Sequence, residues 1–579
     1  MGEKEYERVL LELSDEEDVI SIYSNEDNAF SDEEQKEIHY TTHDSESEQE
    51  ADSNCLPYDH DGNVREFFIG KDLETFWCNT DFSHENARVS AKNIVKILPG
   101  PKGSAKNVKK EIEAFLQIIN YEMIDEIVKF TNMYIERHAS EVDYSRRRDA
   151  KITSRDEICA VIGILILTGL KRLNRTSVEE IWTRDGTGLI AIRACMGYKR
   201  FLFLLRCIRF DDTSTRIERT KFDKLAAVRT LLDSFIHNCK NAYNHSEFVT
   251  IDEKLVPFRG NFSSIQYMPR KPAKFGIKIY AMADAKTFYT SSIEVYCGKQ
   301  HPGPYQQSNK PYDIVYRLSA HIKGSNRNIT IDNWYTSYDL VLSLLEHKLT
   351  CIGTSRKNRK EIPPHFLPHK SREVGSTLFG FQDEIMILSH VPKQNKAVLL
   401  LSSMHNDSSI DTDSSKPCVI LDYNMTKGGV DTTDQMEAKY SVTRMSRRWT
   451  LCLFYTLLNI AGINAQVLYK GNLDNPSLKR RQFLKNLAFQ LMEAHNTERA
   501  KIVSIPKEVR FFLKRFNESD STEEPQPQLK RKRCYYCDTS KNQVTTRQCD
   551  SCLAFVCKTH SSSVIQCNKC TQNDNDVSE

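Results

Sequence analysis

Three acidic positions in the middle of the sequence follow stretches that could present a carboxylate to a common site. Asp252 follows the β-prone run FVTI, and Asp332 follows the similar run NITI. Asp431 and Asp434 are three residues apart in a stretch predicted to be helical, so both lie on one helix face. A single aspartate more often caps a turn, but a carboxylate at the end of a buried strand is poorly solvated unless it faces a cleft, a metal or a partner. Two strand-end acids and one helix acid can therefore converge on divalent metal ions.

Carboxylates in this arrangement suit the cleavage and joining of phosphodiesters. Hydrolysis by water, followed by attack of a 3′-hydroxyl, places negative charge on both the nucleophile and the leaving oxygen. Two divalent ions roughly 4 Å apart stabilise both oxygens, and Mg²⁺ prefers carboxylate ligands. No histidine base is required, so we expect direct hydroxyl attack rather than a covalent protein–DNA intermediate.

The C-terminal region carries a second set of potential metal ligands. Seven of the 17 cysteines and one histidine form four pairs there, with two residues between the members of each pair: Cys534 and Cys537, Cys549 and Cys552, Cys557 and His560, Cys567 and Cys570. Eight such ligands are enough for two tetrahedral zinc sites, and the short segment could bury little without metal. A disulfide framework is disfavoured by the histidine and by the expected intracellular setting.

Two ligand pairings are open. By analogy with interleaved (cross-brace) zinc modules, we expect one zinc on the first and third pairs, which are Cys534, Cys537, Cys557 and His560. The second and fourth pairs, Cys549, Cys552, Cys567 and Cys570, would then hold the other zinc. Sequential pairing is the alternative.

The elements that position the acids change character along the chain. Apolar residues recur at helical spacing before residue 248, including Ile158–Leu170, which is too short to span a bilayer and is predicted to be a core helix. Strands are then predicted at 274–284, 287–298, 329–332, 349–354 and 417–421, with a helix at 337–347 and another beginning near Val430. A meander followed by alternating α and β segments predicts a mixed sheet with helices on its faces.

Charge is distributed unevenly. Residues 1–53 contain 19 Asp or Glu and 3 Lys or Arg, a balance of −16, whereas the rest contains 59 and 77, a balance of +18. The basic body predicts binding to a polyanion, although an acidic tail can also simply solubilise. SDEE at Ser14 and at Ser31 suggests sites for an acidophilic kinase. In SRRW, Arg447, Arg448 and Trp449 combine cations with an aromatic ring, which suits phosphate contact and base stacking.

Several longer motifs together resemble the piggyBac family of DNA transposases. They are TIDEKLVPFRG at 250, KFGIKI at 274, NITIDNWYTS at 328, IGTSRKNRKEIP at 352, YNMTKGGVDTTDQM at 423 and the eight zinc ligands. They occur in the family's order, and LLRCIRFDD at 204 extends the match upstream.

The resemblance implies an RNase H-like catalytic core with an Asp-Asp-Asp triad. Asp252, Asp332 and Asp431 would bind Mg²⁺ or Mn²⁺, with Asp434 as an additional catalytic acid. Arg356 and Arg359 match basic positions of the family and, with Arg447, Arg448 and Trp449, are candidate DNA contacts. The family acts on double-stranded DNA at its terminal repeats, duplicates a TTAA target and cuts through hairpin ends. A homodimer is expected, and no membrane partner is.

The expected fold class is α/β multidomain: an RNase H-like core inserted in an all-α dimerisation and DNA-binding domain, with a C-terminal cross-brace zinc module. The boundaries are 1–65 for the disordered acidic tail, 66–104 for a transition segment, 105–247 and 441–516 for the helical domain, 248–356 and 417–440 for the catalytic core, 357–416 for an insertion domain, 517–533 for a linker with a basic run, and 534–572 for the zinc module.

Two other classes of function compete with the transposase. A domesticated DNA- or chromatin-binding protein would keep the fold and the zinc module, but such proteins often lose catalytic acids, and all four are present here. A ubiquitin ligase or histone-tail reader would also use paired zinc ligands, but its modules have longer gaps between pairs. The KRKR run at 530–533 predicts import into the nucleus.

Overall fold

The computed structural model describes residues 67–79, 91–139, 150–269, 271–472, 478–502, 504–514, 532–541, 543–547 and 554–562. The chain divides into two compact units, Met1–Phe516 and Asn517–Glu579. The predicted acidic tail with its kinase sites, most of the linker, and Cys549, Cys552, Cys567 and Cys570 lie outside the described residues.

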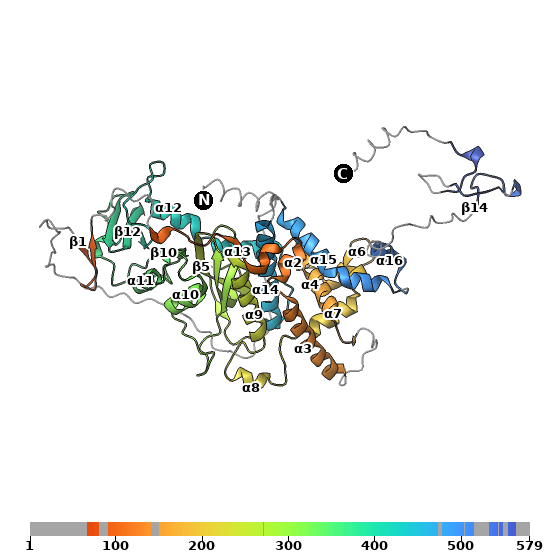
Figure 1. Ribbon diagram of the computed structural model, residues 1–579, viewed down its shortest axis with the longest axis horizontal. Coiled ribbons are helices and arrows are strands. Elements are labelled where there is room, and N and C mark those ends of the chain that lie inside the picture. Colours follow the sequence, from red (N-terminus) through yellow and green to blue (C-terminus); the bar gives the residue numbers. More distant parts are fainter. Residues whose placement is uncertain are drawn as a thin grey trace. The chain divides into compact units, whose positions relative to one another are not determined.

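The larger unit is built on a mixed sheet of eleven strands, flanked by helices (Figure 1). The order is β1-β2-β11-β12-β13-β10-β9-β5-β7-β6, and β8 also pairs with β7. The strands are β1 (Phe67–Ile69), β2 (Phe76–Cys78), β5 (Phe248–Pro257), β6 (Gln266–Tyr267), β7 (Phe275–Asp284), β8 (Thr290–Val295), β9 (Asn328–Ile331), β10 (Thr350–Thr354), β11 (Thr377–Gln382), β12 (Ile385–Lys393) and β13 (Lys396–Ser402). A separate short pair joins β3 (Gly100–Pro101) to β4 (Tyr243–Asn244).

The described α-helices fall into groups before, within and after the sheet segments. They are α2 (Glu111–Leu116), α3 (Tyr121–Ala139), α4 (Arg155–Leu170), α5 (Val178–Ile181), α6 (Ile190–Cys195), α7 (Tyr198–Cys207), α8 (Arg216–Thr220), α9 (Arg229–Ala242), α10 (Pro311–Ser319), α11 (Tyr338–Glu346), α12 (Cys418–Thr426), α13 (Gly429–Lys439), α14 (Trp449–Gly471), α15 (Arg480–Ala500) and α16 (Lys507–Lys514).

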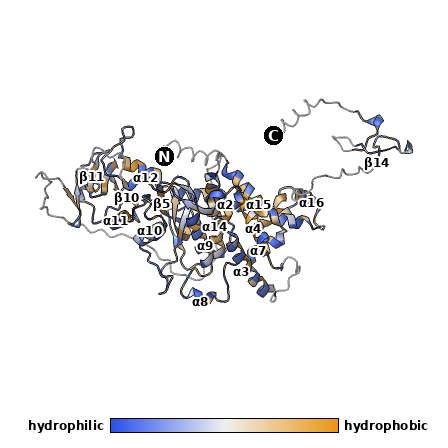
Figure 2. Ribbon diagram, viewed as in Figure 1, coloured by the Kyte–Doolittle hydropathy of each residue, from blue (hydrophilic) through white to orange (hydrophobic). Residues whose placement is uncertain are grey.

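Helices from the two ends of the larger unit form one hydrophobic core. Helix α4 is coloured as hydrophobic along most of its length in Figure 2 and packs against α15, while α14 packs against α2. At the α4–α15 crossing the backbones approach closely, because a Cβ at Gly163 would lie 2.7 Å from the Ala488 carbonyl oxygen. The sheet segments are therefore inserted between two helical segments that pack together in space.

Helix α14 is the central element of this core. It is long and apolar enough to cross a membrane by length and composition, but 94% of its apolar window is buried inside the unit. Its first part packs beside β5, and α13 packs against it as well. The burial identifies α14 as a core helix that joins the helical part to the sheet.

The two faces of the sheet pack against different helices. In β7, Ile277 and Ile279 belong to the core shared with α14, whereas Tyr280 and Met282 belong to a core shared with α10 and α11. This alternation follows from the two-residue period of a strand. Near β10, α12 covers the face opposite to α10 and α11 with its own small apolar cluster.

Two details of the predicted elements are wrong. The stretch 417–421 is not a strand but the start of α12, because a short apolar run suits a helix as well as a strand until its neighbours are known. Strand β5 does not end at Asp252 but continues to Pro257, because β7 pairs with it along its whole length. The segment 357–416 contributes β11 to β13, which extend the central sheet where β13 pairs with β10.

Candidate active site and metal centre

Neighbouring parallel strands place Asp252 and Asp332 side by side. Strand β5 pairs with β9 in register, with Thr250 opposite Thr330 and Ile251 opposite Ile331, and this parallel pairing stops there. Asp252 is the next residue of β5, and Asp332 directly follows the last residue of β9. Because side chains alternate along a strand, Asp252 lies on the same face of β5 as Thr250, toward α12 and α13. Asp332 lies close enough to Asp252 for its charge to raise the pKa of Asp252.

The junction of α12 and α13 is tied to these same threonines. The hydroxyl of Thr250 donates to the Thr426 carbonyl oxygen at 2.6 Å, and the hydroxyl of Thr330 donates to Thr426 Oγ1 at 2.8 Å. A Cβ at Gly429 would lie 2.5 Å from Thr250 Oγ1, so only glycine lets α13 start this close to β5. The first turn of α13, which carries Asp431, is thereby held at the strand that carries Asp252.

A buried lysine on β5 fixes the next turn of α13. Lys254 Nζ lies 3.1 Å from Asp434 Oδ1 and also contacts the Glu437 carboxylate. Burial alone would lower the pKa of Lys254, but Glu437 and Asp434 outweigh it and raise that pKa. Burial also raises the pKa of Glu437, to about 7. Asp434, a candidate catalytic acid from the sequence, thus binds Lys254, and neither Lys254 nor Glu437 was singled out from the sequence.

A second lysine reaches the acids from the loop between β6 and β7. Lys271 Nζ lies 3.1 Å from Asp431 Oδ1. Burial lowers the pKa of Lys271, but the charges of Asp252 and Asp431 exceed that effect and raise it. The Lys271 ammonium group therefore partly balances the negative charges of Asp252 on β5 and Asp431 on α13.

The acids on the strands are poorly solvated. Burial, reinforced by repulsion from Glu253, raises the pKa of Asp252 to about 8. The pKa of Asp332 is raised for the same two reasons, and the Arg356 charge partly opposes this. A divalent cation would offset both the burial of these carboxylates and their repulsion by Glu253. Mg²⁺ prefers carboxylate oxygens as ligands, so the side chains of Asp252, Asp332 and Asp431 are chemically suitable for such an ion. Glu253 directly follows Asp252 in the sequence, and this adjacency could have predicted that the Glu253 charge raises the pKa of Asp252.

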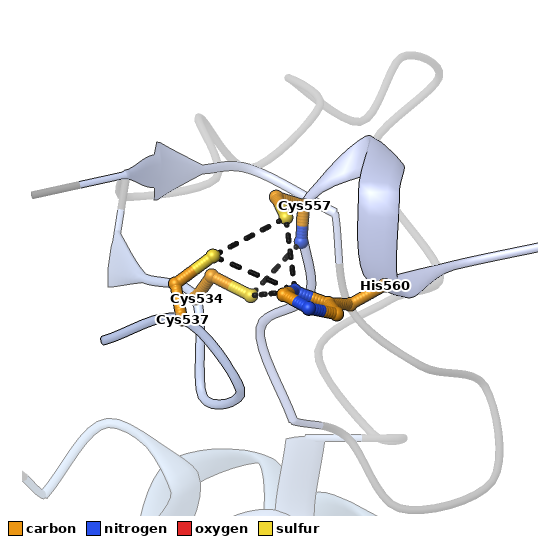
Figure 3. A group of neighbouring side chains, drawn as sticks. All are labelled: Cys534, Cys537, Cys557 and His560. Atoms are coloured by element: carbon orange, nitrogen blue, oxygen red, sulfur yellow. Dashed lines mark hydrogen bonds between the residues drawn. The ribbon is translucent and has the colours of Figure 1, made fainter. Parts of the chain in front are cut away.

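The smaller unit brings four of the predicted zinc ligands together, as Figure 3 shows. The ligand atoms of Cys534, Cys537, Cys557 and His560 all lie within 4.8 Å of one another. His560 Nδ1 lies 3.5 Å from Cys537 Sγ and 3.3 Å from Cys557 Sγ. In the described part of the chain this is the group close enough to hold a metal, whereas the three aspartates do not form such a group.

The first and third ligand pairs meet in this cluster, next to the two-stranded sheet of β14 (Lys532–Arg533) and β15 (Val544–Thr545). The donor set suits zinc.

The sequence profile of the family described as Transposase IS4 matches residues 110–466, which include the three aspartates predicted to form the triad. A cryo-EM structure of a piggyBac transposase synaptic complex with hairpin DNA is similar to this chain, with a TM-score of 0.71 and 34% identity. That match covers 81% of this chain and 99% of the other. The chain belongs to the piggyBac family of transposases.

Two human proteins are more distant relatives in this family. PiggyBac transposable element-derived protein 3 from Homo sapiens is 23% identical over 394 residues, covering 65% of this chain and 63% of that protein. The Chimeric ERCC6-PGBD3 protein from Homo sapiens is similar over the same length, with 35% of that protein covered. The chain therefore spans less than two thirds of either human relative.

The basic residues predicted to contact DNA differ in their environments within this piggyBac-family fold. Arg448 is committed to the protein itself, donating to the carbonyl oxygens of Leu205, Arg206 and Ile208 at the end of α7. Arg359 donates to the Thr336 carbonyl oxygen at 2.8 Å and so supports the loop after Asp332.

The remaining three candidates are placed differently. Arg356 lies close enough to Asp332 to affect its pKa. Arg447 is exposed at the start of α14, and Trp449 is partly buried against Phe262. Among the five predicted contacts, Arg356, Arg447 and Trp449 are those whose side chains make no hydrogen bond or ion pair within the described part of the chain.

Proposed function

We propose that this chain is an active piggyBac-like transposase that cuts DNA and joins it to a new site. The observation that supports the proposal is the position of Asp252 and Asp332, each directly after the last residue pair that joins the parallel strands β5 and β9, with β5 packed against the helix that carries Asp431. Membership of a transposase family supports an enzyme whose substrate is DNA, and the similar solved structure is a complex with hairpin DNA.

In this proposal Asp252, Asp332 and Asp431 hold the catalytic Mg²⁺ or Mn²⁺. When bound, the ions stabilise charge on the attacking and leaving oxygens of the phosphodiester. The chain's own contribution is to hold the acids in place: the Thr250–Thr426–Thr330 contacts anchor the start of α13, and Lys254 anchors its next turn. Lys271 would move away from Asp431, or turn toward the substrate phosphate, as metal charge replaces its own.

The finer steps follow the family resemblance. We infer an RNase H-like core, hydrolysis at the element's ends, hairpin intermediates, strand transfer by a 3′-hydroxyl into TTAA, and a homodimer that holds both ends. The mixed sheet with helices on both faces and the inserted arrangement of its segments support the first of these inferences.

The smaller unit is proposed to bind two zinc ions and to recognise the transposon end. Four ligands in reach of one another support the first zinc, and the four remaining cysteines have the composition for a second. The adjoining KRKR run at 530–533 is proposed to direct the chain to the nucleus.

The test is to incubate the purified full chain with DNA from the borders of its own genomic element and Mg²⁺. Hairpin-capped ends on a denaturing gel, absent with the Asp332→Asn variant and absent without divalent metal, are the expected result. Binding of that DNA without any cleavage, in Mg²⁺ and in Mn²⁺, would instead identify a transposase-derived DNA-binding protein.

A further inference from the structure

A histidine in the loop after β13 binds the helix that leads to Asp431. His405 Nε2 lies 2.8 Å from Asp422 Oδ2, and Asp422 belongs to α12. On its other side the ring contacts Ser402, the last residue of β13, with His405 Nδ1 3.0 Å from Ser402 Oγ. The side chain of His405 is 11% exposed and that of Asp422 is 28% exposed, so the contact is partly shielded from water. This bridge joins the loop to the helix.

The bonds around Ser402 determine which nitrogen of His405 carries the proton. Ser402 Oγ accepts the backbone N–H groups of Met404 at 3.2 Å and His405 at 3.3 Å, which uses its two lone pairs. The hydroxyl hydrogen is then left to donate to His405 Nδ1. Because Nδ1 accepts, Nε2 carries the proton and donates it to the Asp422 carboxylate. The ring therefore makes a directed bond from the end of a strand to α12.

The loop that carries His405 starts from a firmly held part of the sheet. Ser402 pairs with Ile352 of β10. The Ser403 amide donates to the Cys351 carbonyl oxygen at 2.9 Å, and the Ser403 hydroxyl accepts from the Cys351 amide at 2.9 Å. Strand β10 is paired in turn with β9, which ends directly before Asp332. His405 is thus anchored to the same sheet that carries the candidate catalytic acids.

Asp422 is connected through Thr426 to the strands of the candidate site. The two residues are four positions apart in α12, so they lie on one face of the helix. The Thr426 hydroxyl donates to the Asp422 carbonyl oxygen at 2.7 Å, and Thr426 accepts from Thr250 on β5 and Thr330 on β9. Directed bonds therefore hold α12 at two successive turns, at Thr426 by the strands and at Asp422 by His405.

The other constraints on α12 are weak in direction. The helix has nine residues, and its N-cap residue Pro417 makes no side-chain capping bond. Val419 and Ile420 are buried in a small apolar cluster with residues of β10 to β13. Apolar contact of this kind is non-directional, so it keeps the helix on the sheet without fixing its rotation. The bond from His405 to Asp422 supplies that missing constraint one turn before the junction with α13.

We propose that His405 is a positioning residue for the candidate catalytic site: through Asp422 it holds α12, and α12 sets the junction from which α13 presents Asp431. Ser402 is fully buried, which excludes the group of Ser402, His405 and Asp422 as a nucleophilic triad. The inference rests on the proposed DNA-cutting function. It gives the segment 357–416, which the sequence predicts as an insertion domain, a part in assembling the site.

Two substitutions separate the two bonds of the ring. The amide nitrogen of glutamine reaches as far as Nε2 and can donate to Asp422, whereas asparagine reaches only as far as Nδ1 and can bond only to Ser402. Single-turnover cleavage of border DNA by the full chain is measured over a range of Mg²⁺ concentrations. We expect His405→Asn to lower the rate and to raise the Mg²⁺ concentration for half-maximal rate, each by about tenfold or more. His405→Gln should keep most of the wild-type rate.

A second readout does not depend on cleavage. Mg²⁺ should raise the melting temperature of the DNA-free chain, and His405→Asn should need about tenfold more Mg²⁺ than the wild type for the same rise. A variant that is merely less stable would melt earlier but keep the wild-type Mg²⁺ requirement. The matched control is His369→Asn in the same segment, because His369 Nδ1 also lies 2.7 Å from a serine hydroxyl, at Ser371, but the residue is exposed.

A double variant tests whether His405 acts through Asp422. If it does, Asp422→Ala combined with His405→Asn should cleave no more slowly than the slower single variant. Multiplied losses in the double variant, equal losses in His405→Gln and His405→Asn, or an unchanged Mg²⁺ requirement in His405→Asn would overturn the positioning proposal alone. A wild type that cleaves border DNA in neither Mg²⁺ nor Mn²⁺ would overturn the proposed function, and this inference with it.

Discussion

The two candidate metal-binding regions of this chain are assembled in opposite ways. The cysteine and histidine ligands come from pairs close in sequence, and their ligand atoms lie within 4.8 Å of one another. The aspartates come from two strands and a helix, and a lysine 160 residues away from Asp431 in sequence contacts it. The four zinc-type ligands are already grouped closely enough to hold one ion. Among the aspartates, Asp431 is instead paired with the ammonium group of Lys271.

This difference matches the two roles that we propose, a structural zinc site and a catalytic site. A structural zinc site is closed by protein ligands and stabilises the fold of a small unit. A catalytic site must leave room for metal ions and substrate, so its fold has to stand without them. The large hydrophobic core and the Lys254 ion pairs provide that independence here.

The largest effect should come from the aspartates. We expect Asp252→Asn, Asp332→Asn and Asp431→Asn each to reduce cleavage by at least about 10³-fold, because each removes a charged metal ligand at nearly constant volume. DNA binding should persist, and the larger unit should remain folded. Asp434→Asn should cost much less, because its carboxylate binds Lys254, which keeps Glu437 as a partner. Equal losses in all four variants would place Asp434 on the metal.

Loss of one thiolate in the cysteine and histidine cluster should destabilise the fold, whereas the aspartate variants should lose cleavage and stay folded. Cys557→Ser opens a tetrahedral site, so we expect the smaller unit to lose its zinc and unfold, which elemental analysis and limited proteolysis would detect. The melting temperature of the larger unit should not change. A shift of both transitions would show that the zinc unit and the aspartate unit are not independent.

The Lys254 contacts can be broken without touching the triad. Lys254→Met leaves Asp434 and Glu437 without their buried cation, which should reduce the free energy of unfolding by about 3–5 kcal/mol. The triple variant Lys254→Met, Asp434→Asn and Glu437→Gln should recover much of that loss, since no buried charge is left unpaired. Denaturant unfolding of the larger unit measures both, and a triple variant as unstable as the single one would contradict the charge argument.

The smallest effect concerns pH. Burial raises the pKa of Asp252 to about 8, so the folded chain binds this proton more tightly than the unfolded chain. The corresponding stability is present at low pH and is lost as pH rises through about 8. We expect Asp252→Asn to raise the melting temperature of the metal-free protein at pH 8 by about 2 °C or more. Mg²⁺ should stabilise the wild type at pH 8 more than the variant, and Asp434→Asn is the control. A variant with the wild-type pH profile would exclude Asp252 as the source.

Much of this protein is determined by local sequence. The strand predicted at 274–284 forms as β7, the core helix predicted at Ile158–Leu170 forms as part of α4, and the helix predicted to begin near Val430 forms as α13. Local features specify them, such as the Ser154 cap of α4, which accepts from the Glu157 amide. The paired spacing of Cys534, Cys537, Cys557 and His560 likewise indicated a metal cluster, because two residues between ligands suffice to bring a pair to one ion.

Tertiary structure decided what depends on distant partners. The sequence groups Asp434 with the catalytic acids, but only the fold shows that Lys254, on a strand 180 residues earlier, binds its carboxylate. The apolar start of α12 became a helix because it packs as one across the sheet, and β5 passed beyond Asp252 because β7 continued beside it. The sequence predicts Arg448 as a DNA contact like its neighbour Arg447, but in the fold its guanidinium donates to carbonyl oxygens at the end of α7. A residue's type limits what it can bind, but a buried charge takes whichever partner the fold brings within reach.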